Sequence, residues 1–267
     1  MTPYNHLNYT TYSWGPKEVV IKFYFLILCY FFCKPLFADD AVTLKYNLTG
    51  SGNYYPYYTG DSDLPGIFPE IVEQILATAN IQGQHVVLPA RRTVKSLTTS
   101  QIDFDIISTA WLSKNERNNP LFVYSAPLFK MSEYLVSLPE HTDKWQTLAA
   151  IKGKNVGTVR GYYYHNDDEF NRVDFPSEKE LIQALTRQRI EVVIISELSA
   201  LYWSNELAVK VKLGALHSDG FLRIRILQKY RHLLPQINQA IKQLHQTGGL
   251  NKIEQKYRDE ISKIPTL

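Results

Sequence analysis

The sequence has little cysteine. Its two cysteines, Cys29 and Cys33, are the thiols of a 267-residue chain, and both fall in one apolar stretch near the N-terminus. If export removes that stretch, no thiol remains, which excludes a disulfide, a cysteine nucleophile and a cysteine metal site. Charge is also sparse and balanced, because charged residues make up 21% of the chain and the net charge is +3. No run of Lys and Arg marks a nucleic-acid surface, so we expect no nucleic-acid partner.

The sequence also lacks the short motifs of common catalytic sites. Its histidines show no HxxxH or HExxH spacing, which argues against a metal site. It has no GxSxG nucleophile elbow and no GxxxxGK[ST] phosphate loop. We therefore expect no metal, no cofactor and no enzymatic activity.

The N-terminus has the pattern of a secretory signal peptide. Lys17 and Lys22 precede a ten-residue apolar run at 23–32, and a polar segment follows Ala38. A transmembrane anchor would need about 20 apolar residues, twice the length of this run. We predict that residues 1–38 are removed after Ala38 and that the protein is periplasmic. Three lysines and one glutamate leave with them, so the net charge falls to +1.

Predicted strands and helices alternate along the rest of the chain, which indicates an α/β protein with a largely parallel sheet. The helix predicted over 69–80 has Ile71, Ile75 and Ala79 on one face, and Pro69 suits its first turn. The predicted strands cover 41–48, 85–89, 102–107, 130–138, 154–159, 190–195 and 220–226, and the other predicted helices cover 93–100, 178–187, 235–246 and 250–257.

The order of several motifs resembles the family 3 extracellular solute-binding proteins, which serve polar amino-acid transporters. The resemblance covers roughly residues 42–261. Each motif is weak alone, but seven stand in the family's order: NYYPYY, PGIFPEIVEQIL, SQIDFDII, NERNNPLFVYSAPL, LAAIKGKNVGTVRG, LTRQRIEVVII and GGLNKIEQKY.

The resemblance implies the two-lobed type II periplasmic-binding-protein fold, in which each lobe is a mostly parallel sheet flanked by helices. Two crossover strands would form the hinge. Lobe 1 would be discontinuous, covering 39–129 plus 224–267, and lobe 2 would cover 130–223. The lobes would close on a small polar solute, an amino acid or a related carboxylate. The resemblance also implies a monomer that passes the solute to an ABC transporter permease or a membrane sensor.

The resemblance assigns ligand contacts in the first lobe. Arg117 stands where the family has an arginine that pairs with the ligand carboxylate, which its planar guanidinium fits; otherwise it is a surface arginine. Tyr54 stands where an aromatic ring stacks on the ligand; otherwise it packs a turn. Trp111 would fill or line the cleft, with Ser108 and Thr109 as further contacts.

Five more positions follow from the resemblance. Arg92, after a predicted strand, is as well placed for the surface as for the cleft. Tyr162 and Tyr163 stand where the family places Thr or Ser at a helix start facing the carboxylate. Ser196 occupies the place of an aspartate that binds the ligand ammonium, and Glu197 follows it, either as that acid or as a helix N-terminal acid. Because tyrosines replace small hydroxyl residues, we expect a larger, more aromatic or differently charged solute.

Two other functions stay open on the sequence. The first is a periplasmic enzyme on the same fold, resembling cyclohexadienyl dehydratase. Such an enzyme needs an acid or base in the cleft with a shifted pKa, and Glu197 is the evident candidate. The second is an orphan sensory module without a transporter.

Overall fold

Strands and helices alternate from the start of the first half, as the sequence predicts. The computed structural model describes residues 42–52 and 54–264. Both cysteines and the predicted signal peptide lie outside this range. Within it, no helix is long and apolar enough to cross a membrane. The first half contains β1 (Thr43–Asn47), α2 (Ile67–Thr78), β2 (Gln82–His85), α3 (Ala90–Thr98), β3 (Phe104–Ser108), α4 (Lys114–Arg117) and β4 (Phe122–Tyr124).

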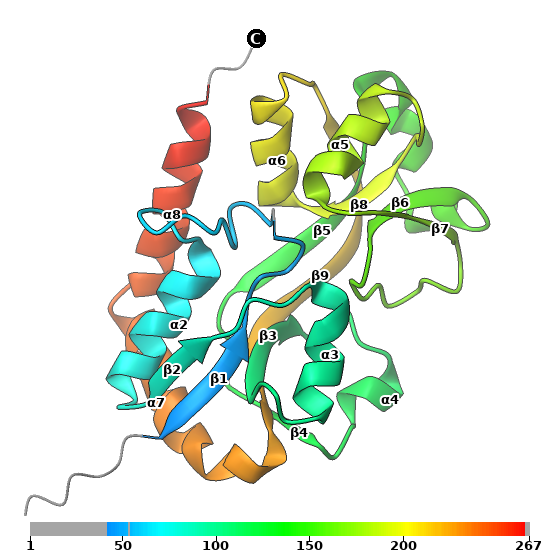
Figure 1. Ribbon diagram of the computed structural model, residues 1–267. Coiled ribbons are helices and arrows are strands. Elements are labelled where there is room, and N and C mark those ends of the chain that lie inside the picture. The colour runs from blue at the N-terminus through cyan, green and yellow to red at the C-terminus, as the bar shows by residue number, and fades with distance from the viewer. Residues whose placement is uncertain (1–41, 53, 265–267) are drawn as a thin grey trace, which may run out of the picture. The chain divides into compact units, whose positions relative to one another are not determined.

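The second half repeats the alternation and ends in helices (Figure 1). Its elements are β5 (Lys130–Ser137), η1 (Pro139–Trp145), η2 (Leu148–Ile151), β6 (Asn155–Val159), β7 (Asn171–Phe175), α5 (Glu178–Thr186), β8 (Val193–Ser196) and α6 (Glu197–Glu206). The chain then continues through β9 (Lys212–Leu227), η3 (Gln228–Leu233), α7 (Leu234–Gln246) and α8 (Gly249–Ser262).

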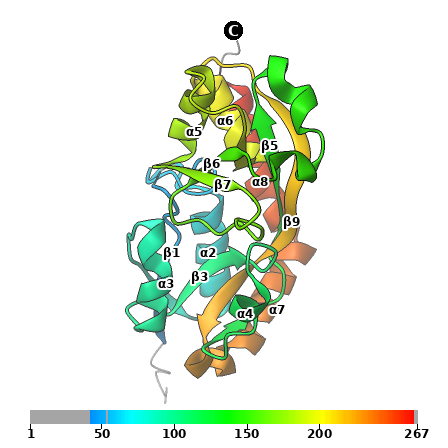
Figure 2. The ribbon, with the colours of Figure 1, turned by 90° about the vertical axis from the view of Figure 1, so that its right-hand side faces the viewer.

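The strands form two groups that share β9. In the first group β1 pairs in parallel with β2 and β3, and β3 and β4 pair antiparallel with the last residues of β9. In the second group β6 pairs in parallel with β7 and β8, and β5 pairs antiparallel with β8 and with the earlier part of β9. Figure 2 shows β9 running the length of both groups. This is the predicted two-lobed α/β fold with β5 and β9 as the crossover strands.

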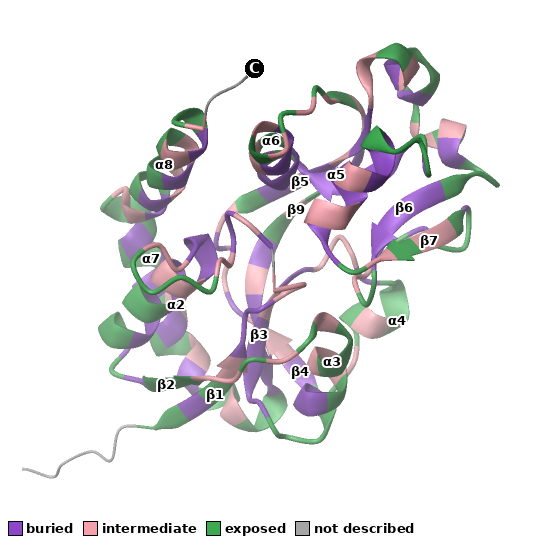
Figure 3. Ribbon diagram, turned by 45° about the horizontal axis from the view of Figure 1, so that its top comes forward, coloured by how far each residue is buried: buried purple, intermediate pink, exposed green. Residues whose placement is uncertain are grey.

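Each group of strands has its own apolar core. In the first, α2, α7 and α8 pack together on one side, and the predicted stripe of Ile71, Ile75 and Ala79 is buried. In the second, α5 and α6 cover β6 and β8. Figure 3 shows the buried positions on the central strands and on the inward sides of these helices. The residue limits predicted for the two lobes stay a prediction.

The strand predicted over 85–89 is wrong in position. The structure places β2 at Gln82–His85, and Val87 is 67% exposed in the segment that follows. β2 lies at the sheet edge and pairs with β1 alone, in parallel register from Thr43 with Gln82. Three of its four residues are exposed and none is buried, so β2 has no apolar run, and the apolar cluster that follows it does not mark the strand.

Candidate ligand-binding site

A cavity lies where β1 and β3 end, beside the loop that follows β6. It has a volume of about 100 Å³ and takes its wall from both strand groups. The carboxyl ends of parallel strands are where open α/β sheets bind ligands. We call it the inner cavity. Its wall consists of Asn47, Leu48, Gly50, Tyr54, Phe68, Ala90, Thr93, Val94, Asp105, Ile106, Ile107, Trp111, Glu133, Gly161, Tyr162, Tyr163 and Arg225.

Aromatic side chains form much of this wall. The ring of Tyr54 meets that of Tyr162 edge-on, with centroids 5.5 Å apart, and thereby joins the two strand groups. The Tyr54 hydroxyl donates to Met131 Sδ at 3.4 Å. Burial raises the pKa of Tyr54 and of Tyr162 well above the usual value for tyrosine, so both hydroxyls are neutral. Phe68 and Trp111 complete an apolar, aromatic surface.

A buried ion pair stands at one end of the inner cavity. Arg225 Nε lies 3.0 Å from Asp105 Oδ1, and Arg225 Nη2 lies 2.6 Å from Asp105 Oδ2. β3 and β9 place the two residues directly opposite each other. Burial alone would lower the pKa of Arg225, but the charge and hydrogen bonds of Asp105 raise it. The guanidinium is therefore fixed and charged, with further N–H groups left for a ligand or for nearby Tyr163.

The second buried carboxylate of the wall is on the crossover strand β5. Glu133 Oε2 accepts a hydrogen bond from Ser218 Oγ at 2.6 Å, and Ser218 Oγ accepts one from Trp111 Nε1 at 3.2 Å. Ser218 lies on β9 directly opposite Glu133. His217 Nδ1 is 3.9 Å from Glu133 Oε2, too far for a hydrogen bond. Both crossover strands thus present polar groups to the inner cavity.

A third buried carboxylate connects the two strand groups. Ser51, in the loop after β1, donates from Oγ to Glu178 Oε2 at 2.5 Å and from its backbone N–H to the Tyr162 hydroxyl at 3.0 Å. Glu178 is the first residue of α5. Its burial raises the pKa of the Glu178 carboxyl from about 4.5 to about 7. We call Ser51, Tyr162 and Glu178 the latch.

Stacked tyrosines add a second connection between the groups. The rings of Tyr55 and Tyr202 lie nearly parallel with centroids 3.6 Å apart, and Ser199 Oγ donates to the backbone oxygen of Tyr55 at 2.8 Å. Ser199 and Tyr202 both belong to α6. Together with the latch, these contacts hold the two groups against each other around the inner cavity.

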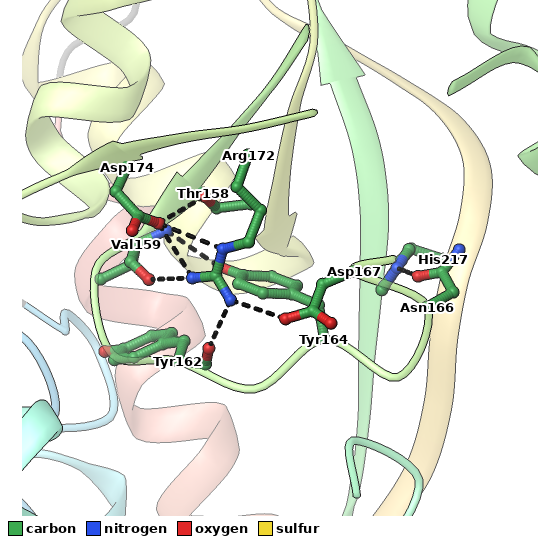
Figure 4. Close-up of polar contacts among 9 residues, drawn as sticks. All are labelled: Thr158, Val159, Tyr162, Tyr164, Asn166, Asp167, Arg172, Asp174 and His217. Carbon is green, nitrogen blue, oxygen red and sulfur yellow. Dashed lines mark hydrogen bonds and ion pairs between the residues drawn. The ribbon is translucent and has the colours of Figure 1, made fainter. Parts of the chain in front are cut away.

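Arg172 fixes the loop that carries the cavity tyrosines (Figure 4). From β7, its guanidinium donates to the backbone oxygens of Tyr162 at 3.2 Å and Val159 at 3.3 Å. It also pairs with Asp167 and Asp174, each at 2.9 Å. Five N–H donors in a rigid fork suit such a multiple contact. We call this arrangement the arginine clasp.

The same loop is held at two further points. The Tyr164 hydroxyl accepts the backbone N–H of Val159 at 2.9 Å, and its ring lies under Arg172 with 5.0 Å between Cζ and the ring centroid. Asn166 Oδ1 is 2.8 Å from His217 Nε2, which ties the end of the loop to β9 (Figure 4). Tyr164 is therefore structural, whereas Tyr162 and Tyr163 face the inner cavity.

A wider, more open hollow adjoins the inner cavity. It has a volume of about 630 Å³ and shares Trp111, Tyr162 and Tyr163 with the inner cavity wall. We call it the outer hollow. Its charged residues are Arg91, Glu116, Asp167, Arg172 and Asp174. Over the described ranges of the chain, no three His, Cys, Asp or Glu side chains gather to hold a metal ion.

Comparison with known proteins identifies the family. The sequence profile of the bacterial extracellular solute-binding proteins, family 3, matches residues 47–260. The chain belongs to this family. No curated protein matches the sequence significantly. The family assignment confirms the resemblance seen in the motifs and makes solute capture the role of the fold.

Solved structures share the fold of this family 3 protein at low sequence identity. The ligand-binding core of GluR0 with L-glutamate has a TM-score of 0.70 and 14% identity, covering 81% of this chain and 98% of that one. A mutant of ArgBP from T. maritima has a TM-score of 0.66 and 17% identity, and the match covers 81% of this chain and 95% of that one. A third structure is the amino acid ABC transporter substrate-binding protein AbpA from Streptococcus pneumoniae, bound to L-arginine. It has a TM-score of 0.65 and 16% identity, and the match covers 82% of this chain and 96% of that one.

Four of the predicted site residues meet at the inner cavity. Tyr54, Trp111, Tyr162 and Tyr163 all line it. They come from the segments after β1, β3 and β6, so the order of strands brings them together. All four therefore belong to one cavity wall, to which both strand groups contribute. Their contact with a ligand stays a prediction.

The other six predicted residues lie outside the inner cavity wall. Arg117 is exposed on α4 and lines a separate surface hollow with Tyr124 and Arg231. Arg117 is the last residue of the four-residue helix α4, which starts at a Ser113–Glu116 capping box and has no buried residue. The rest also lie away from the wall: Arg92 and Glu197 are exposed, Ser108 and Ser196 are buried at strand ends, and Thr109 is half-buried.

Sequence reasoning missed the charged members of the wall. Arg225 stands in the apolar alternation of β9, and Glu133 is a lone acid in the apolar strand β5. A charged residue at a position that the pattern buries is a signal for a paired or functional group. Glu178 gave no such signal, because an acid at a helix start is ordinary.

Proposed function

We propose that this family 3 protein captures a small polar solute, an amino acid or a related carboxylate, between its two lobes. The observation that carries the proposal is the inner cavity, whose wall comes from both strand groups and combines aromatic rings with a fixed arginine. Ligand pockets typically have such a largely apolar wall with a few fixed polar groups. Tyr54, Trp111, Tyr162 and Tyr163 form the aromatic contacts, and Arg225 is the cation available to a carboxylate.

Closure supplies the selectivity of capture. The wall is complete only when the loop after β1 meets the loop after β6, as in the contact between Tyr54 and Tyr162. A solute that touches both lobes favours the closed arrangement through its differential affinity for it. We propose the limits 39–129 plus 224–267 for one lobe and 130–223 for the other. The chain acts outside the cytoplasm as a monomer without enzymatic activity, and delivers its solute to an ABC transporter permease or a sensor.

Thermal-shift screening of the purified protein tests the proposal. The panel contains neutral, acidic and basic amino acids, polyamines, dicarboxylates and sugars. A solute at 100 times its dissociation constant stabilises the folded state by about 2.7 kcal/mol, which raises Tm by roughly 5–11 °C for a chain of this size. A panel in which no solute raises Tm would refute capture.

Two variants then test the assignment of the site. Trp111→Ala should abolish the shift given by the best solute, because the ring lies in the wall. Arg117→Ala separates the sequence-based assignment from the cavity-based one. If Arg117→Ala loses the solute-induced rise in Tm, the carboxylate contact lies on α4, as the sequence predicts. If the rise in Tm is unchanged, the contact belongs to the inner cavity.

A further inference from the structure

The inner cavity wall has an uncompensated negative charge. Of the described residues that line it, three carry formal charge: Asp105, Glu133 and Arg225. Asp105 and Arg225 neutralise each other through two hydrogen bonds of 3.0 and 2.6 Å. Among the described residues, no lysine or arginine forms an ion pair with Glu133, the remaining acid of the wall. It is 6% exposed, and a carboxylate so far from water requires a counter-ion or a full set of hydrogen bonds.

The surroundings of Glu133 supply only part of what it needs. Ser218 donates to Oε2, and in the part of the chain that the structure describes no hydrogen bond reaches Oε1. The nearest basic group, His217, lies 3.9 Å from Oε2 and uses its other ring nitrogen on Asn166. At 3.9 Å the imidazole is too far from Oε2 to donate a hydrogen bond to it.

We infer that the solute has a net positive charge and that Glu133 is the counter-ion of its ammonium group. The inference rests on the proposed function, since it names the charge class of the captured solute. The aromatic wall agrees with it. Tyr54, Phe68, Trp111 and Tyr162 surround the same space, and aromatic rings attract an organic cation placed over their faces.

The size of the inner cavity fits the head group of such a cation. A dry cavity of 150 Å³ binds benzene, which has six non-hydrogen atoms. A cavity of about 100 Å³ therefore holds about four, the size of a trimethylammonium group or the end of a lysine side chain. The rest of the solute occupies the outer hollow, where three acids (Glu116, Asp167 and Asp174) outnumber the two arginines.

Matched pairs of probes test the charge directly on the unaltered protein. Choline is compared with 3,3-dimethylbutan-1-ol, which has the same shape without the charge, and L-lysine with L-norleucine. Isothermal titration calorimetry gives the dissociation constants. We expect the charged member of at least one pair to bind at least tenfold more tightly than its neutral partner.

The variant Glu133→Gln tests the residue. It keeps the acceptor for Ser218 and removes the charge. We expect it to weaken binding of the charged probe at least tenfold and to leave a neutral probe unchanged. The control is Glu140→Gln, an exposed acid in η1, which should bind like the unaltered protein. Circular dichroism and the unfolding midpoint establish that Glu133→Gln is folded.

The outcomes separate this inference from the function beneath it. If a neutral or acidic amino acid binds best and binds Glu133→Gln equally well, solute capture holds and the inference of a cationic solute fails. Equal affinity for both members of each pair overturns the inference without any variant. If no solute of any charge binds, capture itself fails and the inference fails with it.

Discussion

The free energy of unfolding should depend on pH through the buried Glu178 of the latch, and replacement of Glu178 by Gln should remove this dependence. Glu178 is 1% exposed, accepts a hydrogen bond from Ser51 and lies against the Tyr162 hydroxyl. Gln has the same shape and keeps an oxygen acceptor for Ser51, so the substitution changes ionisation more than packing. The charge of Glu133 also disfavours ionisation of Glu178 and so raises its pKa.

The direction of the effect follows from the raised pKa. Burial lifts the pKa of Glu178 from about 4.5 in the unfolded chain to about 7 in the folded protein. Its contribution to stability is complete below pH 4.5 and is lost as the pH rises through 7, because only the unfolded chain ionises freely in that window. A pKa difference of about 2.5 corresponds to about 3 kcal/mol. For a chain of this size that is roughly 6–12 °C in Tm.

Urea unfolding between pH 4 and pH 8 measures the effect as a difference between two proteins. The unfolding free energy of Glu178→Gln minus that of the unaltered chain should grow by about 3 kcal/mol across this range. The subtraction cancels groups common to both, including His85 and His165, whose pKa values burial lowers. Glu197→Gln is the matched control, since Glu197 is also the first residue of a helix but is exposed. A difference that stays flat with pH would show that Glu178 does not titrate in this window.

Three further substitutions test other parts of the structure. Arg172→Lys should break the arginine clasp, so we expect faster amide hydrogen exchange in the loop that Arg172 holds and weaker solute binding. The exposed Arg187→Lys is the control and should change neither exchange nor binding, and unchanged exchange in Arg172→Lys would refute the clasp. Asp105→Asn leaves Arg225 charged and buried without its partner, so we expect a loss of about 3–5 kcal/mol in urea unfolding, and a loss below 1 kcal/mol would contradict the pairing. Tyr202→Ala removes the 3.6 Å stack between the strand groups and should increase the radius of gyration in small-angle X-ray scattering without solute; an unchanged radius would show that the stack does not hold the lobes together.

The fold was predictable because its signals are local and repeated. The buried stripe of α2 follows from apolar spacing at Ile71 and Ile75, and the alternation of strands and helices indicates the parallel pairing of β1 with β2 and β3. The sequence did not predict the position of the edge strand β2, because its residues, Gln82–His85, have no apolar pattern. The strand β7, at Asn171–Phe175, was not predicted either, because it too is a half-exposed edge strand without an apolar run.

The aromatic half of the site was predictable and the charged half was not. Tyr54, Trp111 and Tyr162 follow strand ends, so the order of strands is enough to bring them together. Glu133 and Arg225 meet the cavity through antiparallel pairing with partners 85 and 120 residues away. Such pairing depends on the register of β5 and β3 against β9, and no periodicity in the sequence specifies that register.

The position of Glu133 separates two tasks within the site. It lies on β5 where the register with β9 shifts, at the crossover between the lobes. A group at the hinge moves least when the lobes close, so we expect Glu133 to face the solute in both the open and the closed arrangement. The hydrogen bonds from Ser51 to Tyr162 and Glu178 join the two strand groups, so we expect them to break when the lobes separate. Only contacts that differ between two states can shift their populations. We therefore expect the latch and the cavity tyrosines to drive closure, and the proposed contact to Glu133 to select the charge of the solute before closure begins.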